Sequence, residues 1–323
     1  MKKILLLLLS LALILSCISC TELFGMNKSS YSVRFSVNGE ITETEQRGAL
    51  VLPKDPERNN YIFDGWFYDK ACTQPLAGDD DVRDGDTLYA GWTLDYESII
   101  NSVAEKTQRA NVTIYSTSYI TGGFFGTVTE QRTANGSGVI FKETPDAYYA
   151  LTNNHVVEKI DGYSRVSYTI TDAYENVYDS VSVVCASAEY DLAVLKFRKT
   201  DKPLEVIELA AASPRIGDDV AAISQPNGQK NTLTVGKCTK IDTASFESDS
   251  PSSRVTFPVI YHDSPVDRGS SGGMLLNSDL KLCGIIFAVA YEKDSDEFVS
   301  GLSIPIEKVL EFLAEGDVLP TNN

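Results

Sequence analysis

Residues Asp267–Met274 read DRGSSGGM and are followed by the apolar pair Leu275 and Leu276. Glycine adopts backbone angles that are closed to other residues, so a loop with three glycines can bend sharply and aim its own amides inward. A serine in such a loop can expose its hydroxyl while the N–H groups of Gly269 and Ser271 point at one spot. An oxyanion hole beside a nucleophile requires this geometry. A flexible turn between two strands explains this stretch equally well. Whether it belongs to an active site therefore depends on other residues.

A serine hydroxyl is a weak nucleophile unless a base takes its proton, and a third group usually orients that base. The sequence has two histidines, His155 and His262. His155 follows the apolar run YAL within TNNHV, and Asp191 precedes the apolar run LAVL. In chain order the candidates are therefore His155, Asp191 and Ser271, one of the orders that Ser-His-Asp triads use. His262 precedes Ser271 closely and is the alternative base, although the sequence around His155 favours His155.

Five short motifs carry a family resemblance. They are GSGVI at 136–140, LTNNHV at 151–156, DLAVLK at 191–196, GSSGG at 269–273 and GLSIP at 301–305. Together they resemble the successive motifs of HtrA/DegP-type serine proteases, which belong to the trypsin-like (chymotrypsin-fold) superfamily. The resemblance covers about residues 95–315 and implies that His155 is the general base, Asp191 its orienter and Ser271 the nucleophile. It also implies that the backbone amides of Gly269 and Ser271 form the oxyanion hole.

Residues 267–274, which we call the nucleophile loop, depart from the family pattern at two positions. The family usually has Asn before the catalytic serine and Pro or Ala after the second glycine, where this sequence has Ser270 and Met274. Neither change removes a group from the chemistry. HtrA-type proteases normally continue into one or two PDZ domains, whereas this sequence ends at Asn323. We therefore expect no PDZ-dependent capture of substrates, and the oligomeric state, including the usual trimer, stays open.

The resemblance also indicates where the substrate pocket lies. By superfamily position, Pro265 is at the base of this pocket, and its wall is formed by Phe287, Ala288, Val289 and Ala290. No acidic residue occupies the base, so we expect uncharged, aliphatic side chains at the cleavage point of a protein or peptide substrate. The chemistry needs no cofactor or metal, and two histidines could scarcely build a metal site.

The distribution of apolar residues predicts a mostly β protein, and the family resemblance implies a trypsin-like double β-barrel. Short apolar strands separated by turns fill residues 111–316, as two packed barrels require. A helix over 306–315 is predicted to close this domain, and 317–323 form a tail. Residues 119–135 are expected to be a loop whose GGFFG segment, 122–126, is either a mobile flap near the site or a hydrophobic plug.

Residues 31–93 are predicted to form a separate small β module. The run YSVRFSV at 31–37 alternates with period two, and the strong turn signal Asn38-Gly39 follows it. The pattern FDGWF at 63–67 with LYAGW at 88–92 resembles the Listeria–Bacteroides (internalin B-type) repeat, a β-grasp-like module of bacterial surface proteins. The resemblance implies a spacer or protein-binding role, while aromatic residues that merely pack a core explain the pattern equally well.

The N-terminal residues have the features of a targeting signal. Two lysines precede an apolar run at 4–15 that is too short for a comfortable membrane span. The sequence ILSCISC at 14–20 resembles a bacterial lipoprotein signal, with Cys17 as the preferred lipidated residue and Cys20 as the alternative; a plain cleaved signal peptide is the other interpretation. We expect a signal over 1–20, a tether over 21–30, and a lipid anchor that holds the protein in the bacterial cell envelope.

The remaining features add less to the functional assignment. Residues 94–110 are predicted to be a linker helix with an apolar face. The sequence has 28 basic and 45 acidic residues, a net charge of −17, so nucleic acid is an unsuitable partner. Beyond the leader, Cys72 is the single cysteine of its module, whereas Cys185, Cys238 and Cys283 are expected to be small buried hydrophobic residues, although one disulfide stays open.

The sequence thus predicts an envelope-anchored serine endopeptidase that hydrolyses peptide bonds of unfolded or exposed protein segments. Two alternatives stay open. One is a catalytically silent, protease-like binding protein, which an intact His155–Asp191–Ser271 set argues against. The other is a surface adhesion protein in which the 31–93 module matters most.

Overall fold

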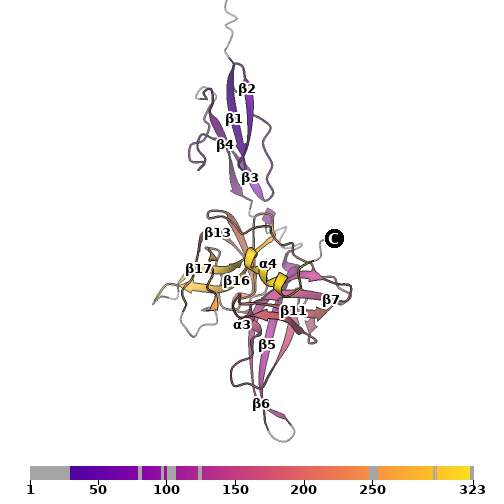
Figure 1. Ribbon diagram of the computed structural model, residues 1–323. Helices are drawn as coiled ribbons and strands as arrows, with labels where there is room; N and C mark the ends of the chain where they lie inside the picture. The colour runs from indigo at the N-terminus through magenta and orange to yellow at the C-terminus, as the bar shows by residue number, and fades with distance from the viewer. Residues whose placement is uncertain are drawn as a thin grey trace, which may run out of the picture. The chain divides into compact units, whose positions relative to one another are not determined.

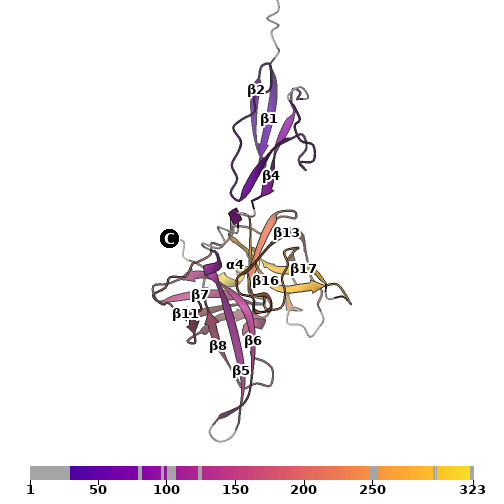
Figure 2. The ribbon, with the colours of Figure 1, turned by 180° about the vertical axis from the view of Figure 1, so that it is seen from behind.

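The chain divides into two compact units, residues 1–94 and 95–323, in the computed structural model (Figures 1 and 2). The structure describes residues 30–78, 82–95, 98–99, 107–122, 126–246, 254–293, 295 and 297–320. Both units consist mainly of strands, so the predicted mostly β class is confirmed. Both candidate lipidation sites, Cys17 and Cys20, lie outside the described residues, and so does most of the predicted linker helix.

The first unit is a four-stranded sheet in the order β2-β1-β4-β3. Its strands are β1 (Tyr31–Val37), β2 (Glu40–Gln46), β3 (Tyr61–Phe67) and β4 (Thr87–Leu94). Asn38 (φ 53°) and Gly39 (φ 91°) form the predicted two-residue turn, because the favoured hairpin turn requires positive φ at both central residues. The aromatic residues singled out in the sequence fill its core, where Trp66 packs edge-on against Phe35 with ring centroids 4.9 Å apart.

The second unit begins with a seven-stranded sheet in the order β10-β11-β7-β6-β5-β8-β9. The strands are β5 (Asn111–Gly122), β6 (Thr127–Glu143), β7 (Ala147–Thr152), β8 (Arg165–Thr171), β9 (Val177–Tyr178), β10 (Ser182–Ser187) and β11 (Leu192–Arg198). Its core holds Ile114, Ile140, Ala150 and Leu195, each with no exposed surface. Because β9 and β10 are edge strands, this half is an open half-barrel.

The second half is a closed six-stranded barrel in the order β12-β13-β14-β17-β16-β15. Its strands are β12 (Asp219–Ser224), β13 (Thr232–Asp242), β14 (Val259–His262), β15 (Met274–Leu276), β16 (Leu282–Tyr291) and β17 (Phe298–Pro305). The predicted C-terminal helix is confirmed as α4 (Ile306–Glu315), which buries Val309, Phe312 and Leu313. A closed barrel beside a half-barrel agrees with the predicted trypsin-like double-barrel class.

The prediction of a loop over residues 119–135 is wrong for most of that range. Strands β5 and β6 continue as a long two-stranded ribbon to Gly122 and from Thr127, with Tyr119 paired to Gln131. Most of this ribbon is exposed, so it lacks the apolar alternation that identifies a half-buried strand. Cross-strand contacts support it instead, such as the hydrogen bond of 2.9 Å between the hydroxyls of Thr117 and Thr133. Residues 123–125 of the GGFFG segment lie outside the described part.

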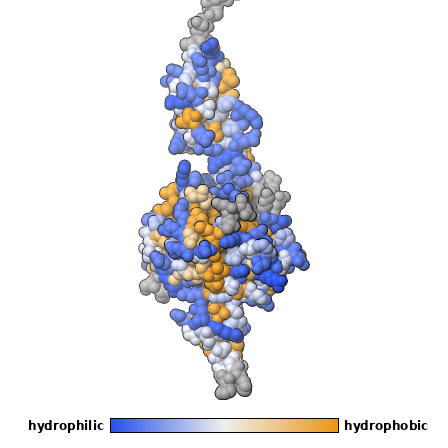
Figure 3. All heavy atoms as spheres, turned by 45° about the vertical axis from the view of Figure 1, so that its right-hand side comes forward, coloured by the Kyte–Doolittle hydropathy of each residue, from blue (hydrophilic) through white to orange (hydrophobic). Residues whose placement is uncertain are grey.

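The surface of the second unit carries hydrophobic residues on the face shown in Figure 3, whereas the first unit is mostly hydrophilic on that face. Among the described residues, no helix is long and apolar enough to cross a membrane.

Candidate active site

Two paired strands bring His155 and Asp191 together. His155 lies in the one-turn helix α3 (Asn154–Val157) directly after β7, and Asp191 directly precedes β11. The strands are antiparallel, with Thr152 opposite Ala193, so the end of β7 meets the start of β11. As a result, residues far apart in the sequence become neighbours through an ordinary sheet pairing.

The contacts between these two residues fix the imidazole. His155 Nδ1 lies 2.7 Å from Asp191 Oδ2, and the His155 backbone N–H donates to Asp191 Oδ1 at 3.0 Å. The Asp191 side chain is almost fully buried, and its backbone adopts a left-handed conformation (φ 50°). The buried Asn153 amide supports that conformation by donating to Asp191 O at 2.9 Å. In a neutral imidazole, a proton on Nδ1 leaves Nε2 unprotonated and able to accept a proton.

Ser271 lies in the loop between β14 and β15 of the closed barrel, so it comes from the other half of the unit. Gly136 of β6 lies between it and α3. A Cβ atom on Gly136 would be 2.7 Å from the Val156 side chain and 3.0 Å from Ser271 O. The structure thus brings the nucleophile loop against the helix that carries His155. Within the described chain no hydrogen bond joins Ser271 Oγ to His155, and such bonds are often long before substrate binds.

Ser137 connects the nucleophile loop to the half-barrel, and the sequence analysis gave it no role. Its N–H donates to Ser271 O at 2.7 Å, and its hydroxyl donates to Gly269 O at 3.0 Å. The same hydroxyl accepts from the Gln225 N–H at 3.1 Å, and Thr152 Oγ1 donates to Ser137 O at 2.7 Å. Ser137 is fully buried. Its only sequence signal is a polar residue inside the buried stretch GSGVI.

The backbone amides proposed for the oxyanion hole differ from the next two amides of the loop in their hydrogen bonding. Gly272 N–H donates to Ile286 O and Gly273 N–H to Ser270 O, both at 2.8 Å. In the described structure, neither the Gly269 N–H nor the Ser271 N–H donates a hydrogen bond to another residue. These two amides are therefore available to a negatively charged oxygen, as an oxyanion hole requires.

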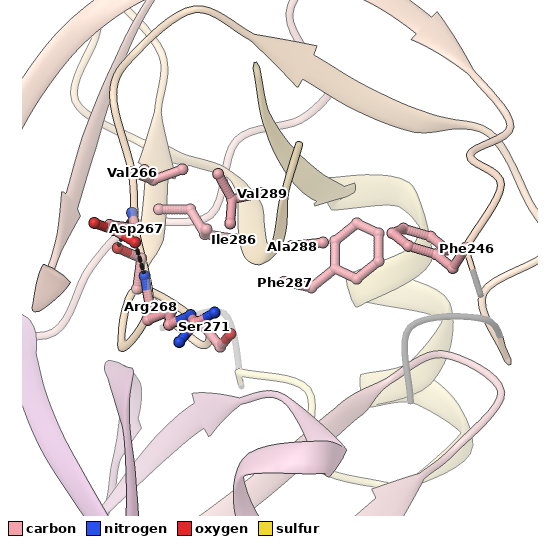
Figure 4. Close-up of a pocket in the computed structure, with 10 residues that line it drawn as sticks. Phe246, Val266, Asp267, Arg268, Ser271, Ile286, Phe287, Ala288 and Val289 are labelled. Atoms are coloured by element: carbon pink, nitrogen blue, oxygen red, sulfur yellow. Dashed lines mark hydrogen bonds between the residues drawn. The ribbon is translucent and has the colours of Figure 1, made fainter. Parts of the chain in front are cut away.

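A cavity of about 240 Å³ opens beside Ser271 (Figure 4). Three residues of the predicted wall line it, Phe287, Ala288 and Val289, whereas Pro265 and Ala290 lie outside its lining. Sequence reasoning did not identify the other lining residues: Phe246, Val266, Asp267, Arg268, Ser270 and Ile286. Figure 4 shows that the Phe246 ring faces Phe287, and their centroids are 5.8 Å apart.

His262 occupies a different environment from His155. Its side chain is fully buried in β14, and Nε2 lies 3.2 Å from the hydroxyl of Ser303 on the neighbouring strand β17. Burial lowers the pKa of His262 to about 4. The alternative assignment of His262 as the base is therefore unsupported, because its ring packs inside the closed barrel and bonds to Ser303.

The structure adds little on metals and disulfides. The described residues contain no group of three or more His, Cys, Asp and Glu side chains that could hold a metal ion. The four described cysteines are free thiols, and of these Cys238 and Cys283 are buried in the barrel core.

Comparison with known proteins agrees with this architecture. Residues 136–285 match the family described as trypsin-like peptidase domain, and residues 31–91 match the Listeria-Bacteroides repeat domain. The serine protease Do-like HtrA of Bacillus subtilis is 33% identical over 196 residues, 58% of this chain and 41% of the relative. The putative serine protease HhoA of Synechocystis is also 33% identical over 196 residues, 59% of this chain and 46% of the relative.

A third relative is the probable periplasmic serine protease do/HhoA-like of Haemophilus influenzae, 28% identical over 190 residues, 55% of this chain and 37% of the relative. The chain spans less than half the length of these three relatives. The matched residues 136–285 lie in the second unit, which is therefore similar to the trypsin-like peptidase domain over most of its length. The same unit is similar in sequence to HtrA and Do-like serine proteases, and the residues before it are similar to a Listeria–Bacteroides repeat, as the motifs indicated.

The buried His262 predicts a pH dependence of stability. The unfolded chain binds a proton at this histidine below about pH 6.5, whereas the folded chain binds it only near pH 4. Protonation of His262 therefore favours the unfolded chain. The free energy of unfolding is unaffected by His262 well above pH 6.5 and falls as the pH decreases from 6.5 towards 4. We expect this loss to reach about 2 kcal/mol at pH 5.

Urea unfolding at pH 8 and pH 5 measures this dependence. The His262→Gln variant, which does not titrate there, is expected to lose about 2 kcal/mol less than the parent between these pH values. Equal losses in both proteins, or a His262 pKa near 6.5 in an NMR titration, would contradict the assignment of a buried neutral imidazole.

Proposed function

We propose that this protein is a serine endopeptidase that cleaves unfolded or exposed segments of other proteins through an acyl-enzyme. The observation that carries the proposal is the orientation of His155 by Asp191, with the Ser271 loop held against the helix that bears this histidine. The homology to HtrA/DegP proteases supports the same reaction class.

In the proposed reaction, Ser271 Oγ attacks the carbonyl carbon of a peptide bond while His155 Nε2 accepts the hydroxyl proton. Asp191 keeps the proton of the ring on Nδ1 and stabilises the imidazolium that forms. The carbonyl oxygen becomes negative and accepts hydrogen bonds from the Gly269 and Ser271 amides, each such donor being worth roughly 10²–10³ in rate. His155 then gives its proton to the leaving amine, and water releases the acyl group by the reverse sequence of steps.

We further propose that the protein acts in the bacterial cell envelope, anchored through lipid on Cys17 or, alternatively, Cys20. Two observations support this location: the lipoprotein-like leader in the sequence, and relatives whose names include periplasmic serine proteases. The Listeria–Bacteroides repeat would then act as a spacer or a protein-binding module next to the membrane.

The direct test is cleavage of an unfolded protein by the parent and by its Ser271→Ala variant. We expect fragments from the parent alone, and a rate in the variant that is lower by at least about 10³-fold, because removal of a triad nucleophile costs up to roughly 10⁶. Similar cleavage by both proteins would show that Ser271 is not the nucleophile. If neither protein cleaves, the alternative of a catalytically silent binding protein would replace the proposal.

The cavity beside Ser271 predicts the preferred residue before the scissile bond. Its walls include Val266, Ile286 and Phe287, and the oxygens of its one carboxylate, Asp267, already accept hydrogen bonds from Tyr291 and Asn227. Matched peptides with Val or Lys at that position should therefore differ about 10–100-fold in kcat/KM, in favour of Val. A survey of cleavage sites dominated by Lys or Arg would overturn this preference.

A further inference from the structure

The direction of one proposed oxyanion-hole amide is set by a neighbouring loop. The Gly269 N–H and the Arg268 carbonyl belong to the same planar peptide unit and point in opposite directions. Arg268 O accepts a hydrogen bond of 2.7 Å from the backbone N–H of Asn227. Asn227 lies in the short segment η2 (Pro226–Gly228), between β12 and β13. A bond that fixes the Arg268 carbonyl on this side therefore fixes the Gly269 N–H on the other side.

Asn227 is suited to this contact by its backbone conformation. Its φ of 52° and ψ of 29° are left-handed, a conformation that asparagine tolerates better than most residues with a Cβ atom. Its side chain makes a second contact, because Nδ2 donates to Asp267 Oδ2 at 2.7 Å. Asn227 thus holds two successive residues of the nucleophile loop. Its backbone N–H bonds to Arg268, and its side chain bonds to Asp267.

Asp267 joins this loop to the pocket wall. Its Oδ1 accepts from the hydroxyl of Tyr291, at the end of β16, and from the Arg268 N–H at 2.6 Å. Hydrogen bonds from Tyr291, the Arg268 backbone and Asn227 hold the pKa of Asp267 below its ordinary value. On the downstream side, Ser270 N–H donates to Asp267 O at 2.9 Å. The carboxylate therefore connects η2, β16 and the nucleophile loop, and it stays charged at neutral pH.

Gly269 makes such a restraint necessary. Its φ of 93° lies in the region that favours glycine, and a Cβ atom there would be 2.6 Å from Gln225 O. A glycine has little intrinsic preference that would keep its amide in one direction. The preceding peptide unit must therefore be held by its neighbours, and the described structure supplies the Asn227 contact for this purpose.

We propose that Asn227, Asp267 and Tyr291 are positioning residues of the oxyanion hole. They hold the peptide unit between Arg268 and Gly269 so that its N–H points towards the oxygen of the substrate carbonyl. The inference rests on the proposed endopeptidase function and extends it to three residues outside the Ser-His-Asp set. None of the three touches the reacting atoms, so their effect acts through the Gly269 amide.

The test compares Asp267→Ala, Asn227→Gly and Tyr291→Phe with the parent on one peptide substrate. Asn227→Gly keeps both the backbone N–H and a residue that accepts positive φ, so it removes only the side-chain bond to Asp267. We expect kcat to fall about 10–100-fold in Asp267→Ala and about 3–10-fold in the other two variants, with KM within about threefold of the parent value. Asn38→Gly, at a similar φ in the first unit, is the matched control and should behave as the parent.

A second measurement separates positioning from general loss of structure. A peptide aldehyde forms a tetrahedral adduct whose oxygen occupies the oxyanion hole, so its inhibition constant should rise by the same factor by which kcat/KM falls. Damage to the substrate pocket would instead raise KM. Asp267→Ala with the kcat and aldehyde affinity of an active parent would overturn this inference alone. A parent that neither cleaves the substrate nor binds the aldehyde would overturn the proposed function, and this inference with it.

Discussion

The contact between Ser137 and the nucleophile loop is the interaction on which the proposed site depends most. The proposed general base and the proposed nucleophile come from different halves of the unit, and Ser137 of β6 bonds to both Ser271 O and Gly269 O. Its hydroxyl uses its donor and an acceptor position at the same time, since it also accepts from the Gln225 N–H. Because Ser137 is fully buried, losing this hydroxyl would leave polar backbone groups unpaired, which costs about 1–3 kcal/mol for each group.

The glycines of the loop are explained by the same contact. Gly272 has a φ of 83°, and a Cβ atom there would lie 2.0 Å from Ser137 O and 2.3 Å from Thr152 Oγ1. The loop can approach the half-barrel this closely only without a side chain at that position. Gly272 thus permits close contact between the two halves, and Gly269 supplies one of the two amides of the proposed oxyanion hole. The Asn227 and Asp267 contacts restrain the same loop at Arg268 and Asp267.

The mostly β fold class, the division into two units and the candidate residues His155, Asp191 and Ser271 could all be predicted from the sequence. Each of them depends on local patterns of residues. The Asn38-Gly39 turn and the C-terminal helix could be predicted for the same reason. Ser137, Asn227 and Tyr291 could not, since their roles depend on hydrogen bonds between residues distant in the sequence. The ribbon of β5 and β6 was missed because both of its faces are largely exposed. The linker-helix prediction lies mostly outside the described residues.

Chemical labelling can show directly whether Ser271 is a nucleophile activated by His155. A serine-directed phosphonate would be added to the folded protein, and the modified peptide located by mass spectrometry. We expect one modified residue, Ser271, and no modification after unfolding or in a His155→Ala variant. Labelling of a different serine would show that Ser271 is not the nucleophile, and labelling of Ser271 at the same rate without His155 would show that His155 does not activate it.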